Sequence, residues 1–179
     1  MSMMLNKTKN EQLTILAISA VVLGVVYLGS KKMKSTITSG AELQARELIK
    51  TFEGFSSKVY LDTAKLPTIG YGHLLKKGES FPNGVTQSQA DKLLDDDMKT
   101  AVNAVNRLVK ANINTNQKAA LISLVFNIGE GNFKSSTLLK RLNAGESVAA
   151  EFDKWVYSGG QVTKGLVSRR TKEKQVFLS

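Results

Sequence analysis

The order of apolar and polar residues predicts an uncharged segment near the start of the chain and helices over most of the rest. Residues 13–29 carry no charge, and lysines stand on both sides of them. A helix over this range would span about 25 Å, slightly less than the roughly 30 Å hydrocarbon core of a bilayer. We therefore predict a marginal membrane segment over 13–29, after a short polar segment over 1–12 and before a polar linker over 30–40.

Two other interpretations of residues 13–29 stay open. The segment could be a buried core helix, although the flanking lysines and the polar stretch that follows favour an exposed junction. It could also be a cleaved signal peptide, although no small-x-small cleavage site stands clearly at its end. Lysines on both sides leave the orientation open, and the three that follow would by themselves keep the C-terminal side in the cytoplasm.

From Ala41 onward the pattern is that of one folded domain over 41–179. Apolar residues recur at helical spacing up to Phe52, and Gly54 is well placed to end that helix. The next stretch, 58–75, holds several glycines, a proline and β-branched residues, which predict short strands and tight turns. A helix followed by a small hairpin region is therefore expected at the start of the domain.

Helix-start signals mark most of the remaining elements. Thr86 and Gln89 form a capping box ahead of an acidic helix through Met98, and a second helix with an apolar face follows it. We expect other helices to begin at Asn114, Ser136 and Ser147, and a basic amphipathic helix to cover 166–178. The predicted fold class is α+β, mostly helical with one small antiparallel sheet.

The charge composition of the chain indicates which classes of partner it could bind. The net charge is +10, from 25 Lys and Arg against 15 Asp and Glu, and such a field attracts polyanions. The polyanion could be nucleic acid, anionic lipid, or the carboxylates and teichoic acids of a bacterial wall. Nucleic acid is the least favoured, because the chain has no arginine-rich arm, zinc-finger spacing or aromatic and basic stripe. The absence of cysteine excludes regulation by disulfide exchange.

Candidate chemistry gathers around the predicted hairpin. Glu53 ends the first helix, and Asp62 and Thr68 follow it in the segment ELIKTFEGFSSKVYLDTAKLPTIGYGH. This segment resembles the phage-type lysozymes, glycoside hydrolase family 24. Two later stretches, FNIGEGNFKSSTLLKRLN and GLVSRRTKEKQVFL, are similar to later blocks of that family in the same order. The resemblance covers 41–179 and implies a lysozyme-like fold.

The resemblance implies an endolysin-type muramidase, which hydrolyses the β-1,4 bond between N-acetylmuramic acid and N-acetylglucosamine in peptidoglycan. It implies that Glu53 is the general acid, that Asp62 is the partner carboxylate, and that Thr68 helps to hold the attacking water. The chemistry requires two carboxyl groups that differ in protonation. Phe52 and Phe55 could desolvate Glu53 and favour its protonated form, whereas Asp62 on an open hairpin could stay ionised. Because the family is regarded as inverting, we expect the two carboxyl groups to lie more than about 6 Å apart.

Four other residues have two interpretations each, and His73 has one. Tyr71 and Phe81 could offer flat surfaces to a sugar, or could pack in the core or at its rim. Arg169 and Arg170 could bind carboxylates of the wall, or could be solvated charges on the last helix. His73 is the only histidine and so cannot form a metal site that needs several histidines. We expect it to brace the hairpin.

Non-catalytic interpretations of the acidic residues also stay open. Glu53 could be a surface carboxylate paired with Arg46 or Lys50. The acidic run 95–97 has no companion histidine, and we interpret it as a solvated helix face instead of a metal site. No metal and no cofactor is expected.

Two other functions remain as alternatives. A lytic transglycosylase would need the acid but no activated water, so Asp62 and Thr68 argue against it. A non-catalytic basic module that binds the wall or a membrane would need none of the three residues.

We expect peptidoglycan as the partner, a membrane contact through 13–29, and a monomer that does not bind nucleic acid. The catalytic domain would act in the periplasm or at the wall, anchored in the host inner membrane or, alternatively, in a virion membrane. The resemblance implies that release of the anchor activates some enzymes of this type.

Overall fold

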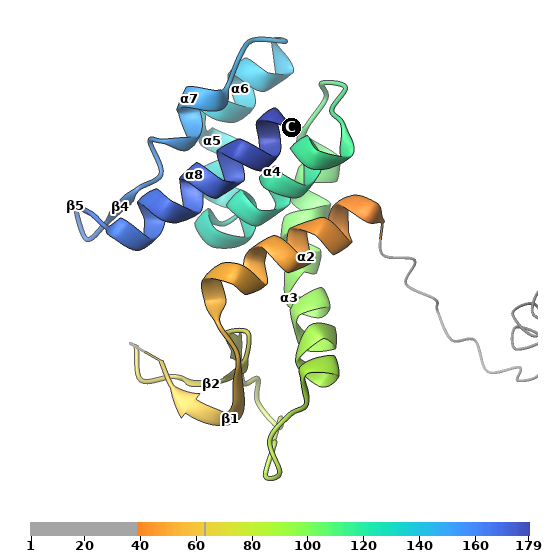
Figure 1. The fold of residues 1–179 in the computed structure, drawn as a ribbon, viewed down its shortest axis with the longest axis vertical. Coiled ribbons are helices and arrows are strands. Elements are labelled where there is room, and N and C mark those ends of the chain that lie inside the picture. Colours follow the sequence, from red (N-terminus) through yellow and green to blue (C-terminus); the bar gives the residue numbers. More distant parts are fainter. Residues whose placement is uncertain (1–38, 63) are drawn as a thin grey trace, which may run out of the picture. The chain divides into compact units, whose positions relative to one another are not determined.

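Helices occupy most of the described chain, which in the computed structural model comprises residues 39–62 and 64–179 (Figure 1). The helices are α2 (Gly40–Glu53), α3 (Gln87–Leu108), α4 (Thr115–Ile128), α5 (Glu130–Ser135), α6 (Thr137–Asn143), α7 (Ala149–Phe152) and α8 (Lys164–Leu178). The strands are β1 (Ser56–Leu61), β2 (Pro67–Gly70), β3 (His73–Leu74), β4 (Tyr157–Ser158) and β5 (Gln161–Val162). The predicted α+β class is confirmed, and the two-stranded β4–β5 sheet adds to the one sheet expected.

Within residues 39–62 and 64–179, no helix is long and apolar enough to span a bilayer. The membrane segment predicted over 13–29 lies outside the described residues. The last residues of the predicted linker already belong to the start of α2, because the hydroxyl of Ser39 accepts a hydrogen bond from the backbone N–H of Glu42 at 3.3 Å.

The helix α2 directly precedes the small sheet in the chain. Its buried face includes Ala45 and Ile49, and the helix ends at Glu53. Gly54 follows with a φ of 67°, a left-handed conformation that a residue with a Cβ atom adopts only under strain. The prediction that Gly54 ends this helix is confirmed, and Glu53 is thereby fixed at a helix end.

The three-stranded sheet has the order β1-β2-β3, and all its strands are antiparallel. Tyr60 pairs with Thr68 and Thr68 pairs with Leu74, so these three side chains form one row on the same face. Ile69 pairs with His73 on the opposite face, and both are buried. Thr68 therefore lies on one face of the sheet, and the buried Ile69 and His73 lie on the opposite face.

The helix α3 is longer than the sequence predicts. The capping box of Thr86 with Gln89 is confirmed, but one helix of 22 residues follows it where two are expected. Its buried residues run along its whole length: Ala90, Leu94, Met98, Ala101, Ala104 and Val105. Because these residues form one continuous apolar face, a single uninterrupted helix buries all of them.

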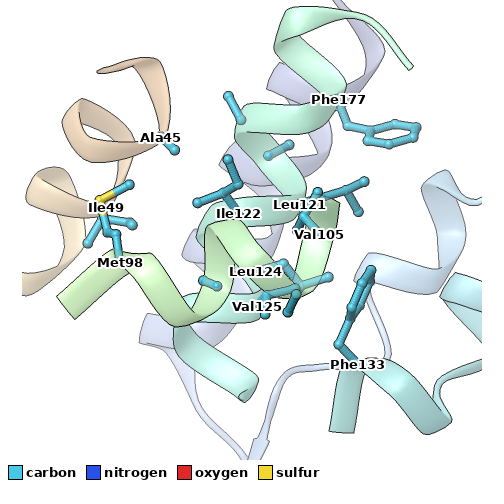
Figure 2. Packing of buried hydrophobic residues seen from close by; sticks show 14 of the residues in the cluster. Ala45, Ile49, Met98, Val105, Leu121, Ile122, Leu124, Val125, Phe133 and Phe177 are labelled. Carbon is cyan, nitrogen blue, oxygen red and sulfur yellow. The ribbon is translucent and has the colours of Figure 1, made fainter. Parts of the chain in front are cut away.

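The core surrounds α4, which begins at the predicted Asn114 cap. Seven of its residues in succession are buried, from Ala119 to Val125. Figure 2 shows side chains of this helix among labelled residues from α2, α3, α5 and α8, such as Ile49, Val105 and Phe177. A helix that is apolar nearly all round needs neighbours on most of its sides, and these helices supply them.

Two short helices complete the comparison with the predicted elements. Ser136 caps α6 as predicted, because its hydroxyl accepts from the N–H of Leu139 at 3.0 Å. Ser147 does not cap α7, whose N-cap residue is Val148, without a side-chain hydrogen bond. The expected helix up to Trp155 is reduced to the four residues of α7.

Candidate active site

Glu53 stands at the end of α2, on the wall of a small cavity. The cavity has a volume of about 280 Å³, and it is lined by Glu53, Gly54, Phe55, Ser56, Tyr60 and Gly70. The side chain of Glu53 is 28% exposed. The carboxyl group is thus fixed through the backbone of a helix end and still accessible to a ligand.

The two carboxyl oxygens of Glu53 have different surroundings. Nη1 of Arg169 donates to Oε1 at 2.6 Å, which is a short, charge-assisted hydrogen bond. Oε2 lies toward Gly72, where a Cβ atom would come within 3.8 Å of it. Gly72 itself has no side chain that would contact Oε2. One oxygen is held by Arg169, and the other lies beside the backbone of Gly72.

The alternative pairing of Glu53 with Arg46 or Lys50 is wrong. Nη1 of Arg46 donates to Asp95 at 3.0 Å, and Nζ of Lys50 lies 3.0 Å from Oδ1 of Asp91. Both contacts join α2 to α3. The basic residues of α2 therefore hold acidic residues of the neighbouring helix and not the carboxyl group at their own helix end.

Asp62 and Thr68 meet at Leu66, at the closed end of the β1–β2 hairpin. The backbone N–H of Asp62 and the hydroxyl of Thr68 both donate to the carbonyl oxygen of Leu66, each at 3.0 Å. In return, Oδ1 of Asp62 accepts from the N–H groups of Leu66 and Ala64, both at 2.8 Å. Local hydrogen bonds thus fix both side chains, with Asp62 half-buried and Thr68 only 2% exposed.

The three predicted residues are brought together in part. Of the three, only Glu53 lines the cavity. Thr68 lies on the same strand as Gly70, which lines the cavity through its backbone. Tyr60, the cross-strand partner of Thr68, lines it as well. The hairpin that carries Asp62 and Thr68 therefore borders the cavity at which Glu53 stands.

The aromatic side chains at the cavity differ from those that the sequence indicated. Tyr60 and Phe55 line it, and each is 40% exposed. Tyr71 is only 6% exposed and packs on Phe55, with 5.4 Å between ring centroids, and Phe81 is half-buried against the core. The signal that could have found Tyr60 is its place in the predicted hairpin, two residues before Asp62.

Arg169 and Arg170 are buried, and the solvated helix face considered for them is wrong. Their side chains are 5% and 0% exposed. Both pair with Glu173, which lies about one turn further along α8 and is itself fully buried. Arg170 also donates to Oδ1 of Asn127 at 2.9 Å. Mutual neutralisation allows these charges to be buried, and in this structure both arginines bind groups of the protein instead of an external carboxylate.

The imidazole ring of His73 connects the sheet to α3 and to the loop after β3. Nδ1 lies 2.8 Å from Oδ2 of Asp97, Nε2 lies 2.9 Å from Oε2 of Glu79, and the side chain is 2% exposed. Burial alone would lower the pKa of His73, but the hydrogen bonds and charges of Glu79 and Asp97 raise it above its ordinary value. A hydrogen bond from the backbone N–H of Lys76, together with His73, holds the pKa of Glu79 below its ordinary value.

This contact makes a testable contribution to stability. A histidine with a raised pKa stabilises the fold fully below its ordinary pKa of 6.5, and the contribution is lost as the pH rises through the folded-state pKa. We expect His73→Asn to lower the free energy of unfolding by about 1–3 kcal/mol at about pH 5.5, and by less at about pH 8.5. Urea unfolding of both proteins at the two pH values measures this. A cost that does not shrink with rising pH would contradict the assignment.

The family of the chain follows from a comparison of its sequence with known families. Residues 50–173 match the family model described as Phage lysozyme. The chain belongs to the phage lysozyme family. The family predicted from the sequence is therefore confirmed.

Relatives and solved structures agree with this family. The endolysin of Bacillus phage B103 is 44% identical over 137 residues, which cover 74% of this chain and 51% of that protein. The SAR-endolysin of Bacteriophage PS119 is 37% identical over 130 residues, covering 70% and 76%. The muramidase domain of SpmX from Asticaccaulis excentricus has a TM-score of 0.68 and 38% identity over 75% of this chain and 95% of that one. The chain thus spans about half the length of the Bacillus phage endolysin.

Proposed function

We propose that the protein is an endolysin-type muramidase, which hydrolyses the β-1,4 bond between N-acetylmuramic acid and N-acetylglucosamine in peptidoglycan. One observation carries the proposal. Glu53 lines a cavity, with one carboxyl oxygen bound to Arg169 and the other beside Gly72. The names of the relatives, two endolysins and a muramidase domain, support the same substrate.

In this proposal Glu53 is the general acid. The oxygen bound to Arg169 already accepts a hydrogen bond, so Oε2 is the atom that carries the proton to the glycosidic oxygen. A proton at the leaving oxygen is what an acetal needs for cleavage. Gly72, beside this atom, has no side chain that would obstruct an approaching glycan.

Asp62 and Thr68 direct the water in this proposal. The hydroxyl hydrogen of Thr68 is engaged by the carbonyl of Leu66, so the hydroxyl offers a water molecule an acceptor. Asp62 keeps Oδ1 in the hairpin turn, and its other oxygen can orient the same water or balance positive charge at the sugar carbon. A separation of more than about 6 Å between the carboxyl groups of Glu53 and Asp62 would leave room for that water.

Mass spectrometry of digested peptidoglycan tests the reaction. Hydrolysis gives N-acetylmuramic acid with a reducing end, because water is added to the broken bond. A lytic transglycosylase would instead leave anhydro-muramic ends. We expect reducing ends only. Anhydro ends as the main product would contradict the hydrolase, and no cleavage by the folded full-length protein would contradict both enzymes.

Residues 13–29 would hold this enzyme at the membrane. The proposal comes from their uncharged sequence and from the similarity to proteins named SAR-endolysins. Fractionation of expressing cells before and after membrane depolarisation tests it. We expect the chain in the membrane fraction before depolarisation and partly outside it afterwards. A chain that never enters the membrane fraction would contradict the anchor.

A further inference from the structure

The carboxylate of Glu173 is the centre of a buried polar cluster on α8. Its side chain has no exposed surface. Oε1 accepts from the hydroxyl of Ser123 at 2.7 Å and from Nε of Arg169 at 3.1 Å, and Oε2 lies 2.8 Å from Nε of Arg170. Ser123 belongs to α4, so the cluster fastens α8 to the central helix of the domain.

All three nitrogens of the Arg169 guanidinium group are engaged. Nε donates to Glu173, Nη1 donates to Glu53 at 2.6 Å, and Nη2 donates to the carbonyl oxygen of Ser123 at 3.3 Å. The group also lies over the ring of Phe52, with 4.9 Å between its carbon and the ring centroid. A planar guanidinium group held at every nitrogen has one orientation, and that orientation sets where Oε1 of Glu53 lies.

The charge of Glu173 is what permits this orientation. Arg169 and Arg170 are neighbours in sequence, and both are buried. Two buried cations without a shared anion would repel each other and would gain by moving toward water. Arg169 has such a route, since its partner Glu53 is partly exposed. Removal of the negative charge at Glu173 would therefore displace Arg169 from its place behind Glu53.

We propose that Glu173 is a positioning residue of this active site, which acts on Glu53 through Arg169. The inference rests on the proposed function, because it assigns a role relative to the general acid. Glu173 does not contact the substrate in this account. Its loss should therefore change the rate of the chemical step and not the binding of the glycan.

The test compares two buried glutamates. Glu173→Gln keeps the size of the side chain and an acceptor oxygen but removes the charge. Glu151→Gln is the matched control, since Glu151 is also buried, at 4% side-chain exposure, and also bridges two basic residues, Arg141 and Lys154. Full-length proteins are assayed on solubilised glycan strands from purified peptidoglycan. We expect Glu173→Gln to lower kcat about tenfold or more with KM within about twofold, and Glu151→Gln to change neither.

A second substitution tests the route through Arg169. Arg169→Lys keeps the charge but cannot contact Glu53, Glu173 and Ser123 together. If Glu173 acts only through Arg169, the two losses should not add. The double variant Glu173→Gln/Arg169→Lys should then be as active as the less active of the two single variants. Losses that multiply would overturn the inference, and so would a wild-type kcat in Glu173→Gln.

The controls distinguish a misfolded variant, a failure of the proposed function and a failure of the positioning role. If Glu173→Gln does not fold, as judged by circular dichroism, Glu173→Asp replaces it. This variant keeps the charge but shortens the side chain by one methylene group, which moves the charge away from Arg169, so a reduced kcat is expected and an unchanged one overturns the inference. An inactive wild type contradicts the proposed function itself. An active wild type with Glu173→Gln equal to Glu151→Gln contradicts only the positioning role.

Discussion

Replacement of Glu53 by Gln is expected to lower the rate of peptidoglycan hydrolysis by about 10²- to 10⁴-fold, the usual contribution of a positioned general acid. The amide has nearly the same shape as the carboxyl group and can still accept a hydrogen bond from Arg169. It cannot transfer a proton to the glycosidic oxygen. The clearing of a suspension of purified walls measures the rate.

Glu47→Gln is the matched control for this variant. Glu47 lies on the same helix, its side chain is 61% exposed, and it contacts Arg46 and Lys50 at 3.4 Å. We expect this variant to clear walls at the wild-type rate, and both variants to keep the wild-type melting temperature within a few degrees. Clearing by Glu53→Gln at the original rate would show that Glu53 is not the acid.

Replacement of Arg170 by Met is expected to cause the largest loss of stability, about 3 kcal/mol. Burial lowers the pKa of Arg170 to about 10 and raises the pKa of Glu173, so each group depends on the other to stay charged in the interior. Met fills much of the same volume, but it leaves Glu173 with one cation and removes the donor to Asn127. A loss of this size should lower Tm by about 6–12 °C in a domain of this length, measured by thermal unfolding.

The control for this prediction is an arginine at the surface. Arg107 pairs with Glu130, but its side chain is 56% exposed. Exposed ion pairs contribute about 0–1 kcal/mol, so Arg107→Met should leave Tm nearly unchanged. Equal shifts in Tm for the two variants would contradict the view that Arg170 stabilises the fold through a buried pair.

Features set by local sequence were predictable. Gly54 ends α2 because its φ of 67° suits glycine, and the capping boxes at Thr86 and Asn114 depend on residues only three positions away. The first motif of the site is local in the same sense. Glu53 stands at a helix end, and Asp62 closes the hairpin turn that follows.

Features set by contacts across the fold were not predictable. Arg169 and Arg170 follow a helical pattern that suits a solvated face, and only the packing of α8 on α4 buries them around Glu173. The acidic run on α3 is similar, because Asp95 and Asp97 are bound by Arg46 and His73 from other elements. A charge pattern along one helix does not show which charges find a distant partner.

The lining of the cavity at Glu53 also depends on contacts across the fold that the sequence does not show. Its aromatic side chains, Tyr60 and Phe55, come from β1 and the residue before it, and Gly70 from β2 completes the lining. The sequence indicated Tyr71, which lies next to Gly70 but points into the core. Tyr60 lies on β1 whereas Tyr71 follows the end of β2, so packing across the fold decides which tyrosine lines the cavity.

A crystal structure of the Glu53→Gln variant with a bound peptidoglycan tetrasaccharide would test the central claim most directly. We expect the scissile glycosidic oxygen within about 3 Å of the side chain at position 53, on its Gly72 side. We also expect a water molecule on the opposite face of the sugar, in contact with Asp62 and Thr68, and more than about 6 Å between the carboxyl positions. A glycan bound elsewhere on the folded protein, or at this cavity with its scissile bond out of reach of position 53, would contradict the account.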